Sequence, residues 1–268
     1  MIRRFHEAPK SIFNEVQKVT DGDYALVNLF AEDPEYYQLF VDALAAGREV
    51  ILDNGVFELG TAWQADEFVK WIRMLKPTWY IVPDVLEDGE LTVAKFFDFI
   101  NKYPNLPGKR IGVAQGRNYR EMVWCYKAIE PYCDMVAMSF DFSWFQDPAC
   151  GANKCLQTMV GRRTMLDMMV DEGVINTSKP HHLLGVMLPQ EVRYYSHPGN
   201  RERFKWIYSI DTSNPVVHGL KGICYMEHGL DSKESQKLYT MINTAVDSQQ
   251  LLDVLYNIEV FRGFCNGT

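Results

Sequence analysis

Short apolar runs alternate with amphipathic stretches of helical period along most of the chain. This alternation is typical of a parallel α/β architecture. The stretch 61–77 is the clearest predicted helix: Thr61 and Gln64 have the spacing of a capping box at its start, and Pro77 ends it. Its apolar stripe is made of Phe68, Trp71, Ile72 and Leu75. A second predicted helix, over 118–131, has the same kind of stripe.

Eight apolar runs between the helical stretches qualify as strands. They are Tyr24–Phe30, Val50–Leu52, Tyr80–Val82, Arg110–Ala114, Met135–Met138, Leu183–Leu188, Ile207–Ile210 and Val216–Leu220. Eight parallel strands close a (β/α)8 TIM barrel, which needs about 250 residues. The 268 residues therefore predict a single barrel domain over 1–268, with an irregular insertion at 140–176 and closing helices from Asp231 to about Phe261.

Charge changes this picture locally. The formal net charge is −8, which disfavours a general affinity for nucleic acid. The segment 151–205 nevertheless carries eight Lys and Arg against five Asp and Glu, a local excess of +3. A basic face on an acidic protein is compatible with a polyanionic substrate, and equally with an ordinary solvated surface.

Other compositional features bear on location. No apolar run approaches the roughly 20 residues of a membrane span, and the charged first residues do not resemble a signal peptide. We therefore expect a cytoplasmic protein without membrane contact. None of the six cysteines forms a CxxC pair, which predicts reduced thiols and no structural metal site.

Candidate chemistry lies where the predicted strands end, because a barrel enzyme places its catalytic residues there. The residues at these ends are Asp53, Asp84, Gln115, Gly185 and Asp211. Each aspartate could simply cap the next helix. A cluster of carboxylates at one barrel mouth would be costly unless it served chemistry or bound a cation.

The segments around these residues resemble a known family. ILDNGVF is similar to the DSGGF/Y segment of tRNA-guanine transglycosylases, and YIVPD, GVAQG, LLGVMLPQE and YSIDTSNP follow in the order of that family's strand motifs. The chain is most similar to the short, phage-type DpdA-type DNA transglycosylases, over roughly residues 24–220. These exchange guanine in DNA for a 7-deazaguanine such as 7-cyano-7-deazaguanine.

The resemblance implies a role for each matching residue. Asp211 matches the nucleophile that bonds the sugar, and Asp53 matches the general acid/base. Asp84 and Gln115 match the side chains that read the edges of guanine. Further pocket residues implied by their positions are Asn54, Phe57, Leu184 and Gly185. The two catalytic carboxylates are then expected to face each other across a purine-sized slot.

Two departures from the family pattern limit the resemblance. Transglycosylases that act on tRNA carry a CxCxxC…H zinc site after the nucleophile strand, and this chain has none there. A Gly-Gly-Leu turn that contacts the 7-substituent is replaced by residues 137–141, where Ser139 and Asp141 are candidates to take over the contact.

The partners implied are DNA, double- or single-stranded, and a free 7-deazaguanine base, with no cofactor and no metal. A basic rim would hold the DNA backbone while the target base leaves the stack. The candidates for this rim are Arg162, Arg163, Arg193, Arg201, Arg203 and Lys205. A tRNA-acting enzyme, an inactive barrel subunit that binds nucleic acid and an unrelated barrel enzyme remain alternatives, and the oligomeric state is open, with a homodimer among the options.

Overall fold

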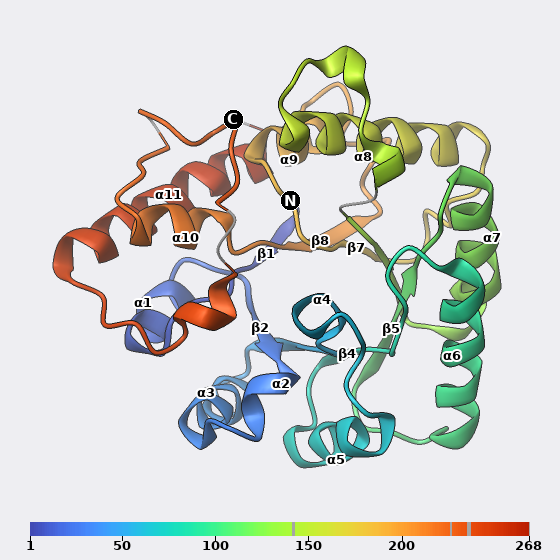
Figure 1. Ribbon diagram of the computed structural model, residues 1–268, viewed down its shortest axis with the longest axis horizontal. Helices are drawn as coiled ribbons and strands as arrows, with labels where there is room; N and C mark the ends of the chain where they lie inside the picture. Colours follow the sequence, from blue (N-terminus) through green and yellow to red (C-terminus); the bar gives the residue numbers. More distant parts are fainter. Residues whose placement is uncertain (141–142, 226, 235–236, 268) are drawn as a thin grey trace. The chain divides into compact units, whose positions relative to one another are not determined.

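A computed structural model of the chain describes residues 1–140, 143–225, 227–234 and 237–267. In these residues, eight parallel strands form a closed barrel in the order β1 to β8, so the predicted (β/α)8 TIM barrel is confirmed (Figure 1). The chain divides into two compact units. Unit 1 comprises Met1–Asp21, Phe140–Ser178 and His182–Thr268, and unit 2 comprises Gly22–Ser139 and Lys179–His181.

Unit 2 holds five consecutive strands and the helices between them. Its strands are β2 (Gly22–Leu26), β3 (Glu49–Asp53), β4 (Trp79–Ile81), β5 (Lys109–Ala114) and β6 (Met135–Met138). Its helices are α2 (Val27–Phe30), α3 (Pro34–Ala45), α4 (Val56–Leu59), α5 (Ala65–Leu75), α6 (Gly89–Lys102) and α7 (Tyr119–Ile129). The register pairs Leu26 with Asp53 and Ala114 with Met138, so neighbouring strands end together.

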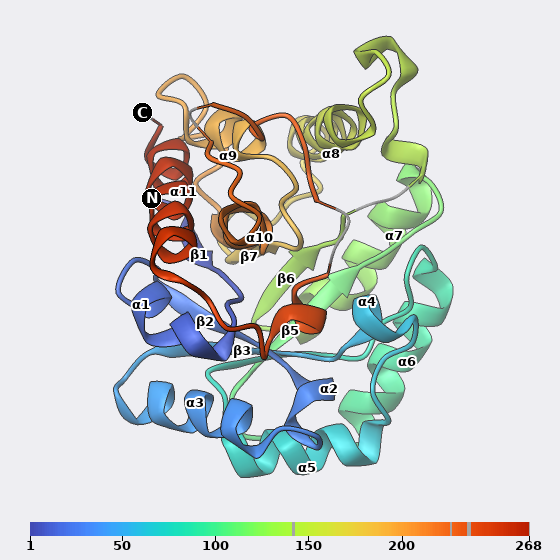
Figure 2. The same ribbon diagram turned by 60° about the vertical axis from the view of Figure 1, so that its left-hand side comes forward.

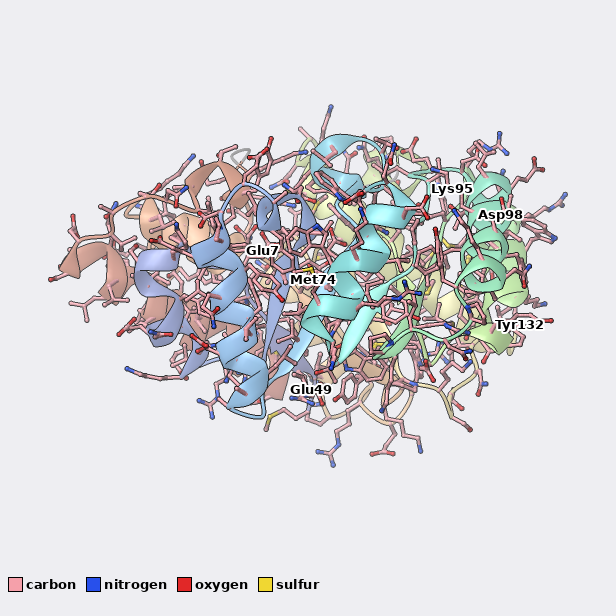
Figure 3. All side chains as sticks on the ribbon, turned by 90° about the horizontal axis from the view of Figure 1, so that it is seen from below. Glu7, Glu49, Met74, Lys95, Asp98 and Tyr132 are labelled. Carbon is pink, nitrogen blue, oxygen red and sulfur yellow. The ribbon has the colours of Figure 1, made fainter. Side chains whose placement is uncertain are left out.

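The helices of unit 2 follow the amphipathic pattern of the sequence. In α6, Phe96 and Phe99 are buried, whereas Lys95 and Asp98 are exposed on the outer face (Figure 3). The helix α5 begins at Ala65, and Gln64 at its N-cap position makes no side-chain capping bond, so the predicted capping box is wrong. Lys76 ends α5 in the left-handed conformation, directly before Pro77.

Unit 1 contributes β1 (Arg3–Phe5) and β8 (Ile207–Asp211), and β7 (His181–Leu183) ends in it. Its helices are α1 (Phe13–Gln17), α8 (Lys154–Asp171), α9 (Pro189–Ser196), α10 (Asn214–Leu220) and α11 (Ser248–Asn266). The last two helices pack side by side (Figure 2), where Val216, Val217 and Leu220 meet Val254 and Ile258 in one apolar cluster.

Three sequence predictions for this unit need correction. Val216–Leu220 is not a strand but most of α10, which begins at Asn214 and has Pro215 in its first turn, where proline favours a helix. The remaining strand of the barrel is β1, a three-residue strand whose Arg4 is buried against Asp21. The insertion at 140–176 is not irregular throughout, since it contains the 18-residue helix α8.

Two predicted strands are also shorter than expected. The strand predicted over Tyr24–Phe30 ends at Leu26, and the one predicted over Leu183–Leu188 is His181–Leu183. The backbone turns at Gly185, whose φ is +54°. Among the described residues, no helix combines the length and the hydropathy of a membrane span.

Candidate functional site

Asp84 lies at the centre of a buried amide–carboxylate–amide cluster in unit 2. It follows β4, whereas Asn54 follows β3 and Gln115 follows β5. The Asn54 amide donates to Oδ1 of Asp84 at 2.7 Å, and the Gln115 amide donates to Oδ2 at 2.6 Å. All three side chains are at most 2% exposed. Burial raises the pKa of the Asp84 carboxyl, against the two amide hydrogen bonds, which lower it.

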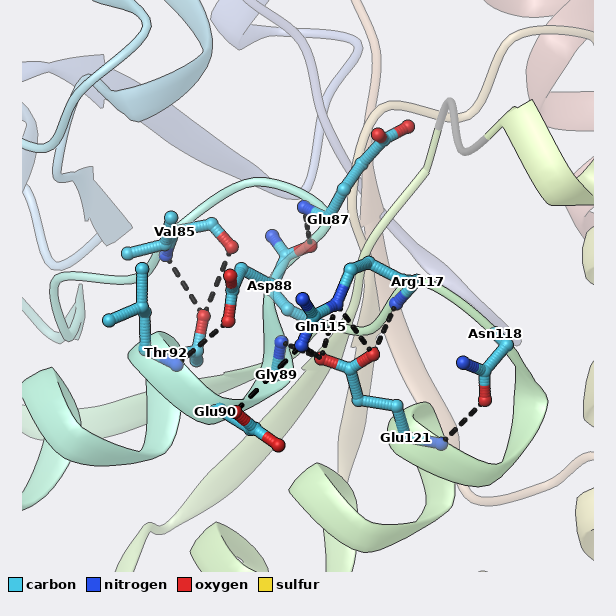
Figure 4. A network of polar contacts seen from close by, with 11 residues as sticks. Val85, Glu87, Asp88, Gly89, Glu90, Thr92, Gln115, Arg117, Asn118 and Glu121 are labelled. Carbon is cyan, nitrogen blue, oxygen red and sulfur yellow. Dashed lines mark hydrogen bonds and ion pairs between the residues drawn. The ribbon is translucent and has the colours of Figure 1, made fainter.

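The loops after β4 and β5 are joined around Gln115 (Figure 4). Its side-chain oxygen accepts from the backbone N–H of Glu87 at 3.1 Å, so both ends of the amide are fixed. Glu121, in the first turn of α7, accepts from the backbone N–H groups of Gly89 and Arg117 at 2.8 and 3.0 Å. The hydrogen bond from the Arg117 guanidinium lowers the pKa of Glu121 to about 2. The orientation of the Gln115 amide is therefore set by the surrounding loops.

Asp53 ends β3 with its carboxylate held by two donors of unit 2. Oδ1 accepts from the Tyr24 hydroxyl at 3.2 Å, and Oδ2 accepts from the backbone N–H of Gly55 at 2.9 Å. Gly55 has a φ of +77°, a conformation that other residues rarely adopt, and it lies at the N-cap position of α4. The Asp53 side chain is buried, with 6% of the residue exposed.

Asp211 ends β8 in unit 1, and its two carboxylate oxygens have different surroundings. Oδ1 bonds Nε2 of His182 at 2.9 Å and the backbone N–H of Gly185 at 3.0 Å. Nδ1 of His182 bonds the Ser209 hydroxyl at 2.7 Å, so a tautomer with its proton on Nε2 satisfies the whole chain of contacts. Oδ2 accepts no hydrogen bond from any residue that the structure describes. Oδ2 is therefore the less engaged of the two carboxylate oxygens.

His6 is a second buried histidine of unit 1, directly after β1. Phe5 pairs in register with Asp211. Nδ1 of His6 contacts the carbonyl oxygen of Thr212 at 2.8 Å, and since a carbonyl only accepts, Nδ1 carries the proton. Burial lowers the pKa of His6 to about 4, which keeps the ring neutral near pH 7. Its Nε2 is buried and has no hydrogen-bond partner among the described residues.

The other predicted pocket residues have less defined surroundings. Phe57 lies in α4 and is half-buried, and Ser139 is buried directly after β6. Leu184 and Gly185 are half-buried after β7. Asp141 lies outside the described residues. Asp53 and Asp211 belong to different compact units, so the expectation that they face each other stays a prediction.

Arg162 is wrongly predicted as a rim residue. Its side chain is 2% exposed, and the guanidinium forms a buried ion pair with Glu191, with hydrogen bonds of 2.6 and 2.8 Å to the two carboxylate oxygens. The reason is that Arg162 lies on the inner face of α8, between the buried Met159 and Met165.

The remaining basic candidates differ in what they contact. Arg203 is engaged by two carboxylates, Asp167 and Asp171, and so is poorly placed to hold phosphate. The guanidinium of Arg163 stacks on the Tyr194 ring, 3.7 Å from its centroid. The three exposed basic residues left in the predicted rim are Arg193, Arg201 and Lys205.

Sequence reasoning missed His182 and Ser209. A signal for Ser209 exists, because residues two apart on a strand share a face and Ser209 precedes Asp211 by two on β8. His182 carries no comparable signal, since a buried histidine on a strand looks like any satisfied core residue. Within the described residues, no group of three or more His, Cys, Asp or Glu side chains is arranged to hold a metal ion. The six cysteines are free thiols.

Comparisons with known proteins bear on the fold. No protein-family model and no curated protein matches the sequence. The structure is similar to an enolase protein from environmental sequencing of the Sargasso Sea (TM-score 0.46, 9% identity, 79% of this chain and 54% of that one). It is also similar to 2,3-dimethylmalate lyase, a PEP mutase/isocitrate lyase superfamily member (TM-score 0.48, 11% identity, 98% and 91%).

A third similar structure is a mandelate racemase/muconate lactonizing enzyme-like protein from Rubrobacter xylanophilus DSM 9941 (TM-score 0.40, 9% identity, 78% and 56%). The chain spans about half the length of the enolase and racemase-like proteins. At such identities the likeness concerns the fold and not the chemistry.

Proposed function

We propose that this chain is a base-exchange enzyme that replaces guanine in DNA with a 7-deazaguanine, of the 7-cyano-7-deazaguanine type, through a covalent bond between Asp211 and the sugar. The observation that carries the proposal is the amide–carboxylate–amide cluster of Asn54, Asp84 and Gln115. It joins the ends of three consecutive strands in one buried, hydrogen-bonded unit. Two of its members, Asp84 and Gln115, match the family's base-reading positions, and Asn54 matches a position that lines the pocket.

The cluster suits recognition of guanine. A carboxylate oxygen has two lone pairs, so each oxygen of Asp84 can accept a second hydrogen bond beside the amide already present. The N1–H and 2-amino groups of guanine are a matching pair of donors. Adenine presents no such pair on that edge, and it would leave the buried carboxylate without compensation.

Asp211 suits covalent catalysis because one oxygen is held, whereas the other accepts no hydrogen bond from the described residues. In the proposed reaction, Oδ2 attacks C1′ of the target nucleotide as the C1′–N9 bond breaks. The bonding pair leaves with the purine, which takes a proton from Asp53 and departs as free guanine. The incoming 7-deazaguanine then loses its N9 proton to Asp53, and N9 attacks C1′ and displaces the Asp211 carboxylate. The exchange needs no oxidant and no external energy source.

The polymer contact is assigned to the exposed part of the basic segment. Arg193, Arg201 and Lys205 are exposed, and the Lys205 ammonium lies 3.9 Å from the exposed Glu202 carboxylate. Arg162 and Arg203 are engaged by carboxylates at shorter distances. Extruding the target base costs a few kcal/mol, which backbone contacts of this kind can offset.

An exchange assay tests the proposal directly. Single- and double-stranded DNA and tRNA, each with radiolabelled guanine, are incubated with the protein and 7-cyano-7-deazaguanine, and released guanine is counted. We expect release from DNA, a trapped protein–DNA adduct with wild-type protein, and no adduct with Asp211→Asn. Asp98→Asn serves as the control, because Asp98 is exposed on the outer face of α6 (Figure 3).

The outcomes separate the alternatives. Release from tRNA alone would contradict the assignment to DNA, and full activity of Asp53→Asn would contradict the acid/base role. No release from any polymer, with nucleic acid still bound, would overturn the enzymatic proposal in favour of a binding subunit.

A further inference from the structure

Arg162 forms the buried ion pair between α8 and α9, and one of its guanidinium nitrogens bonds a group outside that pair. Nε and Nη2 of Arg162 bond the two oxygens of Glu191, and the Tyr195 hydroxyl donates to Oε1 of the same carboxylate at 3.2 Å. Nη1 is not needed by Glu191 and donates instead to the backbone carbonyl of Leu184. The guanidinium thus connects the ion pair to the turn that follows β7.

The same peptide unit contacts the Asp211 carboxylate at its other end. The Leu184 carbonyl belongs to the peptide whose N–H, on Gly185, donates to Oδ1 of Asp211 at 3.0 Å. Because a peptide unit is planar, fixing the direction of its carbonyl also fixes the direction of its N–H. A hydrogen bond from a cation to the carbonyl also polarises the peptide and strengthens the N–H as a donor.

The turn is shaped so that only glycine fits. Gly185 has a φ of +54°, and a Cβ there would lie 2.5 Å from the Phe140 ring. The peptide is therefore held from three sides: by the Arg162 cation at its oxygen, by Asp211 at its nitrogen and by the Phe140 ring beside the glycine.

We propose that Arg162 is a positioning residue for the nucleophile: it orients the Leu184–Gly185 peptide, which in turn holds Oδ1 of Asp211 and leaves Oδ2 aimed for attack. This inference rests on the proposed function. A purely structural ion pair would stabilise the fold without changing the rate of the covalent step, so the two roles make different predictions.

The test uses Arg162→Lys, with Tyr195→Phe as the matched control. Lysine keeps a positive charge beside Glu191 but lacks the planar fork that reaches Glu191 and Leu184 together. Tyr195→Phe removes a hydrogen bond from the same buried cluster without touching the peptide. Two quantities are measured: the Gly185 amide signal in a 15N–1H NMR spectrum with its rate of hydrogen exchange, and kcat and KM for base exchange.

We expect Arg162→Lys to move the Gly185 amide proton upfield and to speed its exchange with solvent. We also expect kcat to fall between about 10- and 100-fold, as for a small misplacement of a reacting group, with KM for the free base within about twofold. Tyr195→Phe should resemble the wild type in both measurements. If Arg162→Lys does not fold, the double variant Arg162→Met/Glu191→Met replaces it, because an apolar pair removes both charges together.

An unchanged Gly185 amide in a folded variant, or an unchanged kcat with a displaced amide, would overturn the inference. Failure of the proposed function looks different, since the wild-type protein would then exchange no base with any polymer. In that case only the NMR measurement tests whether Arg162 orients the peptide. A Gly185 amide signal that is the same in Arg162→Lys as in the wild type would again overturn the proposal.

Discussion

Lowering the pH from 7 to 5 should destabilise this protein through two buried neutral histidines. Burial lowers the pKa of both His6 and His181 to about 4, from an ordinary value of 6.5. Nδ1 of each ring donates to a backbone carbonyl, that of Thr212 or of Lys179, and Nε2 of His181 accepts from the Tyr126 hydroxyl. Protonation of Nε2 on either ring would place a positive charge in the protein interior, which is unfavourable.

The sign follows from proton linkage. The unfolded chain binds a proton at each histidine as the pH falls through 6.5, whereas the folded protein binds it only near 4. Stability is therefore complete above pH 6.5 and is lost as the pH falls towards 4. A pH of 5 is about 1.5 units below the pKa of histidine in the unfolded chain. At about 1.36 kcal/mol per unit, each histidine therefore lowers the free energy of unfolding at pH 5 by about 2 kcal/mol. The sum of about 4 kcal/mol is a large part of a typical stability of about 5–15 kcal/mol.

Urea unfolding at a series of pH values measures this loss by linear extrapolation. The double variant His6→Asn/His181→Asn keeps an amide donor in place of each Nδ1 and cannot titrate at these positions, so its stability should fall much less than that of the wild type between pH 7 and pH 5. His218, whose pKa burial also lowers, still contributes to the remaining loss. In His228→Asn, a change at an exposed position, the free energy of unfolding should depend on pH as it does in the wild type. A wild-type stability that is flat over this range, or a double variant with the wild-type slope, would refute the reasoning.

Three further predictions concern single elements and are measured by urea or thermal unfolding. Gly185→Ala should cost about 2–5 kcal/mol, because alanine is strained at positive φ and its Cβ overlaps the Phe140 ring; a cost below 1 kcal/mol would contradict this geometry. Arg162→Met should cost about 3–5 kcal/mol by leaving Glu191 buried and unpaired, and adding Glu191→Met should restore most of the loss. Asp247→Ala should cost about 1 kcal/mol by removing the capping box of α11, whereas Glu259→Ala, at an exposed position of the same helix, should change stability by less than about 0.5 kcal/mol.

The sequence predicts the barrel well because its alternation of short apolar runs and amphipathic helices repeats along the chain. The predicted strand Met135–Met138 has the observed bounds, and the one at Val50–Leu52 lies inside β3. The two failures have different causes. The run Val216–Leu220 is short and apolar, and periodicity over so few residues does not separate a strand from a buried helix. The strand β1 was not predicted, because two of its three residues are arginines and it does not form an apolar run.

The candidate site was predictable only where it coincides with strand ends. Asp53, Asn54, Asp84, Gln115 and Asp211 each follow or end a strand of the barrel. Arg162 shows the opposite limit, because nothing in a local window distinguishes a basic residue on an exposed helix face from one paired with a carboxylate 29 positions away. Charge counting therefore overestimated the basic rim.

The two carboxylates with the best-defined surroundings show how local bonding separates two roles. Both oxygens of Asp84 are fixed by amides, which leaves the group oriented as an acceptor and poorly suited to forming a bond itself. On Asp211 the two donors, one from His182 and one from Gly185, converge on a single oxygen, and the other has no hydrogen bond within the described part of the chain. This asymmetry favours a nucleophile, because a hydrogen bond to the attacking oxygen would withdraw electron density from it and weaken its attack on carbon. The asymmetry depends on a histidine that lies outside the sequence motifs and on the backbone of a turn. The motifs point to the aspartates, and the different bonding of Asp84 and Asp211 supports the proposal that the first reads the base and the second is the nucleophile.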